Sequence, residues 1–284
     1  MDSKEFGLVA AQQLFQVEDL HYGFWTADDK TQLKNWKKAK RRHTEYLFEY
    51  INKSISSKDT SRLLDIGCGI GITTKKLLSR GYNVDGLVPY KWMADYAKNI
   101  TNEFKSDKKG KIYECTFEKF PIDSLINKYD VVFFSESYQY VNMIQSFEVL
   151  DKILNKIGSV IIFDFFKKNN IEGTSPLGGG HSINSFYNLV KKYNYNIKFD
   201  IDVTKNLSPN LKLVNEVIIN RLIPFSETLN QFMLSRHKYI YRTIKWLLRK
   251  RINKIKFKYS EKRNEENFIK YKTYRLIVLT KNNL

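Results

Sequence analysis

Between residues 59 and 168, short apolar runs of strand length alternate with segments of helix length, and this alternation restricts the fold more than any other feature of the chain. The fourth run, YDVVFFSES, is strongly apolar, as expected of a strand that is buried on both faces. Strands that alternate with helices are joined by right-handed crossovers and form a mostly parallel sheet. We therefore predict an α/β fold with a doubly wound sheet.

Outside residues 59–168 the regular alternation of strands and helices ends. The stretches 196–204 and 272–281 supply a sixth and a last strand, and 143–158 is an amphipathic helix that we expect to end at Gly158. The predicted organisation is an N-terminal helical lid, a Rossmann-like core, a glycine-rich loop with a helix and the sixth strand, a basic helical cap insertion, and the last strand with its tail. Their respective ranges are 1–58, 59–168, 169–203, 204–270 and 271–284.

The stretch LLDIGCGIG is the most informative motif. Asp65 ends the first strand, and Gly67, Gly69 and Gly71 follow at alternate positions. Glycines at this place let the backbone turn tightly and approach a ligand at the carboxyl edge of the sheet. The spacing differs from the Gly-x-Gly-x-x-Gly that is typical of NAD-binding folds.

On these residues the chain resembles the class I S-adenosylmethionine-dependent methyltransferases. LDIGCGIG is similar to the first motif of that family, YDVVFFSESYQYV to its fourth-strand motif, and SVIIFDFF to its fifth strand. The resemblance covers residues 59–168. It implies a seven-stranded Rossmann-like sheet, S-adenosylmethionine as cofactor and methyl transfer as the reaction.

The piece HYGFW, His21 to Trp25, adds a finer resemblance to the small-molecule branch of the family. Methyltransferases of the tocopherol, phosphoethanolamine and sarcosine types, and cyclopropane fatty acid synthases, have similar aromatic pieces before the first motif. The resemblance implies a lid in which Tyr22 and Trp25 contact the cofactor carboxylate and exclude water. A loop that only packs a helix onto the sheet is the alternative.

Carried over position by position, the resemblance implies roles for several residues. Asp65 would anchor the methionine ammonium, Ser135 would approach the methionine portion, and Thr116 and Phe117 would flank adenine. The full implied cofactor site comprises Tyr22, Trp25, Asp65, Gly67, Cys68, Gly69, Gly71, Val88, Pro89, Thr116, Phe117 and Ser135.

Two positions depart from the family pattern. The end of the second strand, where the family usually has a carboxylate that holds the ribose, is Val88, followed by Pro89, and Thr116 stands where a second acidic residue is usual. A valine side chain accepts no hydrogen bond and proline donates none. We expect the cofactor still to bind, with its ribose held by backbone groups, water or a lid residue. A non-catalytic cofactor-binding protein is one alternative.

Methyl transfer from a sulfonium is an in-line displacement, so alignment supplies much of the catalysis. A base is needed only for an alcohol or a protonated amine. The candidates for catalytic roles are His21, Tyr22, Glu136 and His181. Structural roles, in packing or in hydrogen bonding, are open for each of them.

The formal net charge of the chain is +18. The stretch 236–275 holds 15 Lys/Arg and 3 Glu, so 15 − 3 = +12 of charge lies there. Such a region attracts anions, although Lys and Asn are abundant throughout the chain. We predict a small, anionic acceptor, phosphorylated or nucleotide-linked, that is methylated on O or N, for example a cell-surface glycan precursor. A lipid-directed or cyclopropane-synthase-like enzyme at the membrane surface is the other catalytic alternative.

The cap itself has apolar residues near helical spacing, so one face can cover a core while the other presents cations. These residues are Leu229, Phe232, Met233, Ile240, Ile244, Leu247, Leu248, Ile252 and Ile255. Two alternatives are open, namely a lid that attracts a phosphate- or carboxylate-bearing substrate, and a basic amphipathic helix that makes peripheral contact with a membrane of acidic lipid.

Several classes are disfavoured by what the chain lacks. It has neither the Asn/Asp-Pro-Pro-Tyr motif of amino-directed DNA methyltransferases nor the Cys-Pro pair of cytosine C5 enzymes, and no nucleic-acid partner is expected. No Cys/His cluster has metal-ligand spacing, so we predict no metal site. No apolar run approaches a membrane span, no signal peptide is evident, and two cysteines suggest no disulfide framework. A cytoplasmic protein is expected.

Overall fold

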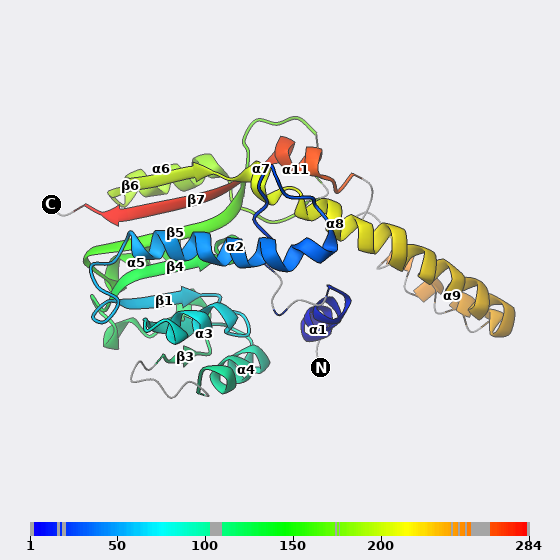
Figure 1. The fold of residues 1–284 in the computed structure, drawn as a ribbon, viewed down its shortest axis with the longest axis horizontal. Helices are drawn as coiled ribbons and strands as arrows, with labels where there is room; N and C mark the ends of the chain where they lie inside the picture. The colour runs from blue at the N-terminus through cyan, green and yellow to red at the C-terminus, as the bar shows by residue number, and fades with distance from the viewer. Residues whose placement is uncertain are drawn as a thin grey trace.

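The structure is a computed structural model that describes residues 3–15, 18, 21–102, 110–173, 175, 177–239, 241–243, 245–247, 249–250 and 262–282. Within these residues, seven strands form one sheet in the order β3-β2-β1-β4-β5-β7-β6 (Figure 1). Only the two pairs that β7 makes, with β5 and with β6, are antiparallel. The predicted doubly wound, mostly parallel Rossmann-like sheet is therefore confirmed. The strands are β1 Arg62–Ile66, β2 Asn83–Leu87, β3 Ile112–Tyr113, β4 Tyr129–Ser135, β5 Leu154–Lys167, β6 Tyr195–Asp202 and β7 Lys272–Lys281.

Helices cover both faces of this sheet (Figure 1). Phe134 of β4 lies in one buried cluster with side chains of α5 and α6, whereas its neighbour Phe133 lies in the other with side chains of α2 and α3. Because successive strand residues point to opposite faces, a strand buried on both sides must be apolar at every position, which accounts for the VVFF run. The helices are α1 Ser3–Phe15, α2 Leu33–Asn52, α3 Ile72–Ser79, α4 Lys91–Asn102, α5 Met143–Ile153, α6 Ile183–Lys192, α7 Thr204–Leu207, α8 Asn210–Val217, the π-helical η4 Ile218–Leu222, α9 Ile223–Arg236 and α11 Glu265–Tyr271.

One boundary differs from the sequence prediction. The amphipathic helix ends at Ile153 rather than at Gly158, because Leu154 pairs with Tyr129 and begins β5. The ladder then shifts register before Ser159 pairs with Val131. Gly158 lies within that shift, and a Cβ there would lie 2.9 Å from Cδ2 of Leu154.

The expected cap splits into two parts that differ in burial. Leu207, Leu211 and Leu213 of α7 and α8 are buried against the body. From Ile223 onward the chain leaves the body, and α9 runs away from the sheet (Figure 1). Leu229, Phe232 and Leu247 are 49%, 55% and 65% exposed, so the prediction that they cover a core is wrong. The other predicted apolar positions of this stretch, except Met233, lie outside the described residues, namely Ile240, Ile244, Leu248, Ile252 and Ile255.

We call residues 223–250 the arm. Beyond α9 the chain turns at His237, and Lys245 Nζ donates a 3.4 Å hydrogen bond to Oδ1 of Asn230, so the returning helical segment lies beside α9. Within the described residues, no helix is both long enough and apolar enough to cross a membrane.

Candidate active site

A cavity of about 620 Å³ opens at the carboxyl edge of the sheet, where β1 and β4 end. The glycine loop after β1, the polar residues at the end of β4 and part of α1 all line it. Its lining residues are Gly7, Leu8, His21, Asp65, Gly67, Cys68, Gly69, Ile70, Ile72, Thr73, Met93, Ser135, Glu136 and Tyr140. Parallel strands direct their carboxyl ends to one edge, which brings residues from distant parts of the chain together.

The first glycine of the loop has no room for a side chain. Gly67 has a φ of +76°, and a Cβ on it would lie 2.5 Å from the Cβ of Ser137. The amides of Gly67 and Cys68 both donate to the carbonyl oxygen of Leu87, at 2.8 and 3.0 Å. The hydroxyl of Ser137 donates to the carbonyl of Ile66, so β1, β2 and β4 together hold the loop at the cavity.

Asp65 lies at the floor of this cavity. Its side chain is buried, and its Oδ2 accepts a 2.9 Å hydrogen bond from the hydroxyl of Thr74 in α3. Burial raises the pKa of the Asp65 carboxyl to about 7, and the Thr74 hydrogen bond offsets part of that increase. A cationic ligand group in the cavity would stabilise the ionised carboxylate.

Glu136 lines the cavity directly after the end of β4. Its Oε1 accepts hydrogen bonds from the amide of Tyr22, at 2.7 Å, and from the hydroxyl of Tyr274, at 2.8 Å. Burial raises the pKa of the Glu136 carboxyl, and the positive charge that His21 can carry acts in the opposite direction. Glu136 also has a φ of +57°, a left-handed conformation that is unfavourable for a residue with a side chain. Such strain is found mainly at functional sites.

His21 is held between the N-terminal segment and the sheet. Its ring stacks on that of His43 at 4.6 Å, and His43 in turn stacks on Phe163 of β5 at 4.2 Å. Nδ1 of His21 lies 2.9 Å from the carbonyl oxygen of Tyr22, and Lys40 Nζ donates to the carbonyl of His21 at 2.6 Å. The imidazole is therefore fixed in place at the cavity rim.

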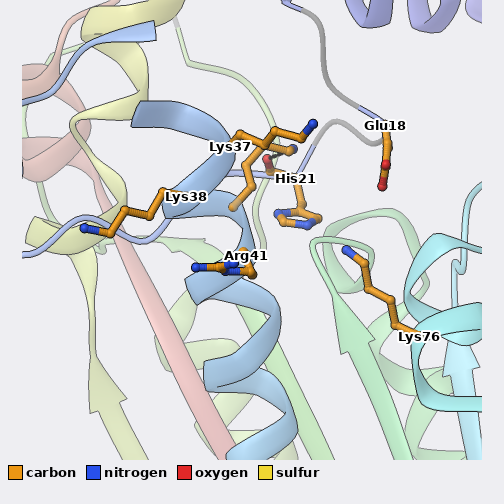
Figure 2. Close-up of a pocket in the computed structure, with 7 residues that line it drawn as sticks. Glu18, His21, Lys37, Lys38, Arg41 and Lys76 are labelled. Atoms are coloured by element: carbon orange, nitrogen blue, oxygen red, sulfur yellow. Dashed lines mark hydrogen bonds between the residues drawn. The ribbon is translucent and has the colours of Figure 1, made fainter. Parts of the chain in front are cut away.

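A second cavity, of about 390 Å³, adjoins the first at His21, which lines both. The ammonium groups of Lys37 and Lys76 lie on either side of the His21 ring, whereas Lys38 points away (Figure 2). The residues that line this second cavity are Glu18, His21, Lys37, Lys38, Lys40, Arg41 and Lys76. We call it the basic cavity; its charge suits an anion.

Seven of the predicted site residues line the large cavity, and eight do not. Those that line it are His21, Asp65, Gly67, Cys68, Gly69, Ser135 and Glu136. Those outside its lining are Tyr22, Trp25, Gly71, Val88, Pro89, Thr116, Phe117 and His181.

The residues of the second group have other surroundings. Trp25 packs with Trp36, Ala39 and Leu213. The Tyr22 ring faces Tyr274 and Phe268, and burial raises the pKa of its hydroxyl to about 12.

Val88 packs with Cys68 and Ala94, whereas Pro89 and Thr116 are exposed. Phe117 lies in the core against Phe134. His181 Nε2 lies 3.0 Å from the carbonyl oxygen of Tyr138, to which the loop is thereby attached.

Sequence reasoning missed several lining residues. Met93 and Tyr140 each follow a strand end by a few residues, in WMADY and SESYQY, and that position was the available signal. No sequence signal marked Gly7 and Leu8 of α1, because only the tertiary fold brings the first helix to this edge of the sheet. Among the described residues, no group of three or more His, Cys, Asp or Glu could hold a metal ion.

Comparison with known proteins identifies the domain that carries this cavity. Residues 64–162, from the strand before the glycine loop into β5, match the family model of a methyltransferase domain. The chain therefore contains an S-adenosylmethionine-dependent methyltransferase domain. Sequence relatives include proteins named ubiquinone biosynthesis O-methyltransferase, from Rickettsia typhi at 23% identity over 77% of this chain and 94% of the relative, and from Rickettsia felis at 25% identity over 52% and 56%.

Solved structures of similar fold cover nearly the whole methyltransferase. A putative sarcosine dimethylglycine methyltransferase from Galdieria sulphuraria has a TM-score of 0.71 at 16% identity, over 96% of this chain and 97% of that one. Geranyl diphosphate C-methyltransferase from Streptomyces coelicolor A3(2) has 0.67 at 14% identity, over 95% and 92%. A cyclopropane synthase from Mycobacterium tuberculosis has 0.63 at 15% identity, over 94% and 90%. At these identities the likeness concerns the fold.

The large cavity fits S-adenosylmethionine. Its volume is in the range of cofactor sites, and the glycine loop lines it with Gly67 and Gly69, which have no side chains to fill it. The cofactor carries an ammonium and a sulfonium, and the cavity holds the buried carboxyl group of Asp65 and the half-buried carboxyl group of Glu136. When bound, the cofactor supplies an electrophilic methyl group.

Proposed function

We propose that the methyltransferase transfers a methyl group to an oxygen, or else a nitrogen, of a small anionic acceptor. The observation that carries this proposal is the basic cavity, which shares His21 with the cofactor cavity. An acceptor held there by Lys37 and Lys76 would reach the cofactor cavity at His21. The O-methyltransferase names of the Rickettsia relatives support oxygen over nitrogen as the acceptor atom.

We assign Glu136 and His21 to the acceptor proton. Both hydrogen bonds to Glu136 are made to Oε1, and we assign Oε2 the proton that an alcohol loses as its oxygen is methylated. Burial raises the pKa of this carboxyl towards neutrality, which makes it a better base than an exposed glutamate. His21, at the junction of the two cavities, would orient the acceptor. Asp65 would hold the cofactor ammonium.

The other proposed contacts follow the family pattern only in part. Ser135, Cys68 and Gly69 line the cavity and would contact the cofactor. Val88, Pro89, Thr116 and Phe117 lie outside the described lining, so we propose that the ribose and adenine rely mainly on backbone groups and on Met93. The phosphorylated or nucleotide-linked nature of the acceptor, including a glycan precursor, remains part of the proposal.

The test is a label-transfer assay with methyl-labelled S-adenosylmethionine and acceptors in matched pairs that keep a free hydroxyl, such as UDP-glucose with glucose and 4-hydroxyphenyl phosphate with hydroquinone. We expect kcat/KM to be higher for the charged member of a productive pair, by about tenfold for one additional ion pair in a partly desolvated site. Equal labelling of charged and neutral members would contradict the anionic acceptor. Cofactor binding without transfer of label to any acceptor would contradict the proposed methyl transfer.

A lipid-like acceptor is the second candidate. The name of the Rickettsia relatives refers to ubiquinone biosynthesis, and the arm exposes apolar side chains. A prenylated phenol in the same assay tests this candidate, which predicts that adding a prenyl chain to the phenol raises kcat/KM.

A further inference from the structure

The arm exposes large apolar side chains to an extent that the rest of the molecule does not. Sixteen large apolar side chains stand exposed among the described residues, and seven of them lie between 223 and 247. They are Ile223, Phe225, Leu229, Phe232, Tyr239, Trp246 and Leu247. Across α9, all of which is described, no residue is buried. A cluster of this kind marks a surface that another body covers.

The apolar side chains are arranged along one side of α9. Phe225, Leu229 and Phe232 follow one another at spacings of four and three residues, which places them on one helical face. Phe225 and Phe232 are 67% and 55% exposed. The returning segment adds Trp246, which is 62% exposed, beside α9.

The same arm is strongly basic. Between 223 and 250 the chain has one acidic residue, Glu227, and six cations, so the charge is 6 − 1 = +5. The cations are Arg236, Lys238, Arg242, Lys245, Arg249 and Lys250. The Arg249 and Arg236 guanidinium groups lie 5.6 and 6.0 Å from the ring centroids of Trp246 and Phe232, so charge and apolar surface are interleaved.

We propose that the arm docks the methyltransferase on the surface of a membrane rich in anionic lipid. Exposed Phe, Leu and Trp side chains insert at the boundary between headgroups and acyl chains, and Lys and Arg beside them pair with lipid phosphates. A second copy of this chain is a poorer partner, because two arms of charge +5 repel each other. Nucleic acid would pair with the cations but would leave most of the apolar side chains in water.

This docking concerns where the enzyme works and does not depend on which acceptor it methylates. In the view of Figure 1, α9 extends away from the sheet, on the opposite side from the chain's carboxyl terminus. The arm can therefore contact a bilayer while the body stays in water.

The test is flotation of the full chain with vesicles of phosphatidylcholine alone and of phosphatidylcholine mixed with phosphatidylserine. We expect the protein to float with the mixed vesicles only. The apolar triple variant F225S/F232S/W246S should lose most of this binding. The charge variant R242E/K245E/R249E should weaken binding by at least about a hundredfold, since each cation near an anionic surface is worth about fivefold in affinity.

Matched controls alter the same chemistry elsewhere. I126S/I157S removes two exposed isoleucines outside the arm, and K128E/K156E/K191E reverses three exposed lysines outside it. Both should float as the wild type does. Circular dichroism and cofactor affinity, measured on all variants, should be unchanged, because neither set touches the cavities.

Three outcomes would overturn the proposal. The first is a wild type that does not float with the mixed vesicles. The second is flotation that the control variants reduce as much as the arm variants do. The third is a dimer that the arm variants dissolve while vesicle binding is absent, which would assign the arm to a second copy of the chain.

Discussion

The backbone amide of Tyr22 donates a 2.7 Å hydrogen bond to Oε1 of Glu136, although 114 positions separate the two residues. The bond joins the N-terminal segment to the carboxyl end of the most central strand of the Rossmann-like core. Tyr274 of β7 donates to the same oxygen at 2.8 Å. Three regions of the chain thus meet at one carboxylate, and the cofactor cavity forms around it.

Glu136→Gln should separate the structural from the chemical role of this residue. The amide oxygen can still accept from Tyr22 and Tyr274, so the melting temperature should change little. The side chain can no longer take a proton, so kcat should fall by about 10²-fold or more if Glu136 is the base. Cofactor affinity, measured by calorimetry, should fall much less than kcat. An unchanged kcat would exclude Glu136 as the base.

Glu136→Ala should in contrast destabilise the fold. It leaves the half-buried Tyr22 amide without its acceptor, at a cost of about 1–3 kcal/mol, and leaves the Tyr274 hydroxyl only the longer hydrogen bond, of 3.4 Å, to the carbonyl oxygen of Phe163. Urea unfolding measures this loss. The matched control is Glu148→Ala at an exposed position of α5, which should have the stability of the wild type.

Asp65 should make cofactor binding depend on pH. Burial raises the pKa of its carboxyl to about 7 in the free protein, whereas an exposed aspartate titrates near 3.9. Below pH about 7 the carboxyl is protonated and cannot pair with the cofactor ammonium. The affinity should therefore rise with pH and level off above 7, changing by about tenfold per pH unit below that value.

The raised pKa of Asp65 also makes the stability of the folded protein depend on pH. Because the folded protein holds this proton at a pH where the unfolded chain releases it, the Asp65 contribution to the stability of the free enzyme falls as the pH rises towards 7. Calorimetry at several pH values, with Asp65→Asn as control, tests both effects. If Asp65→Asn keeps the pH dependence of the affinity, another group is responsible.

Gly67→Ala should remove cofactor binding and lower stability. The new Cβ would lie 2.5 Å from the Cβ of Ser137, and the φ of +76° costs a residue with a side chain about 1–2 kcal/mol even without the clash. Gly178→Ala is the matched control, because nothing lies within 4 Å of the Cβ it would add. Cofactor titration and thermal unfolding measure the difference. Equal behaviour of the two variants would mean that the loop is more adaptable than its contacts indicate.

Val88→Asp should destabilise the protein without restoring the family's ribose contact. Val88 is 2% exposed and packs with Cys68, Ala94 and Ala97, so a carboxylate there would be buried without a partner. A cost of several kcal/mol is expected, and Val88→Asn, of similar shape but without charge, should cost less. Tighter cofactor binding by Val88→Asp at an unchanged melting temperature would contradict this expectation.

Lys37→Glu combined with Lys76→Glu should raise KM for an anionic acceptor and leave kcat nearly unchanged. Reversing two cations at the basic cavity weakens anion binding by about tenfold or more, and neither lysine lies at the proton-transfer position. Lys128→Glu combined with Lys156→Glu, exposed and outside both cavities, is the control. A KM that is equally affected in both pairs would point to the overall charge of the molecule rather than to the basic cavity.

The sequence by itself determined the sheet and one side of the site. Apolar runs at successive positions force burial on both faces, and glycines at 67, 69 and 71 leave only a tight loop after β1, so Asp65 and that loop could be predicted from local pattern alone. Ser135 and Glu136 followed from their place after the fourth strand. These predictions depended on contacts between near neighbours in the sequence.

Tertiary structure decided the rest, because the remaining contacts join residues that are distant in sequence. Tyr22 and Trp25 lie three positions apart in one aromatic piece. Packing against α2 and α8 nevertheless takes Trp25 away from the cavity, while the Tyr22 amide stays at Glu136. His181 lies on the expected loop, but the carbonyl of Tyr138 holds it outside the cavity lining. The arm also could not be predicted from local pattern. The spacing of Leu229 and Phe232 predicts an apolar face, but only the path of the chain decides whether that face meets a core or solvent.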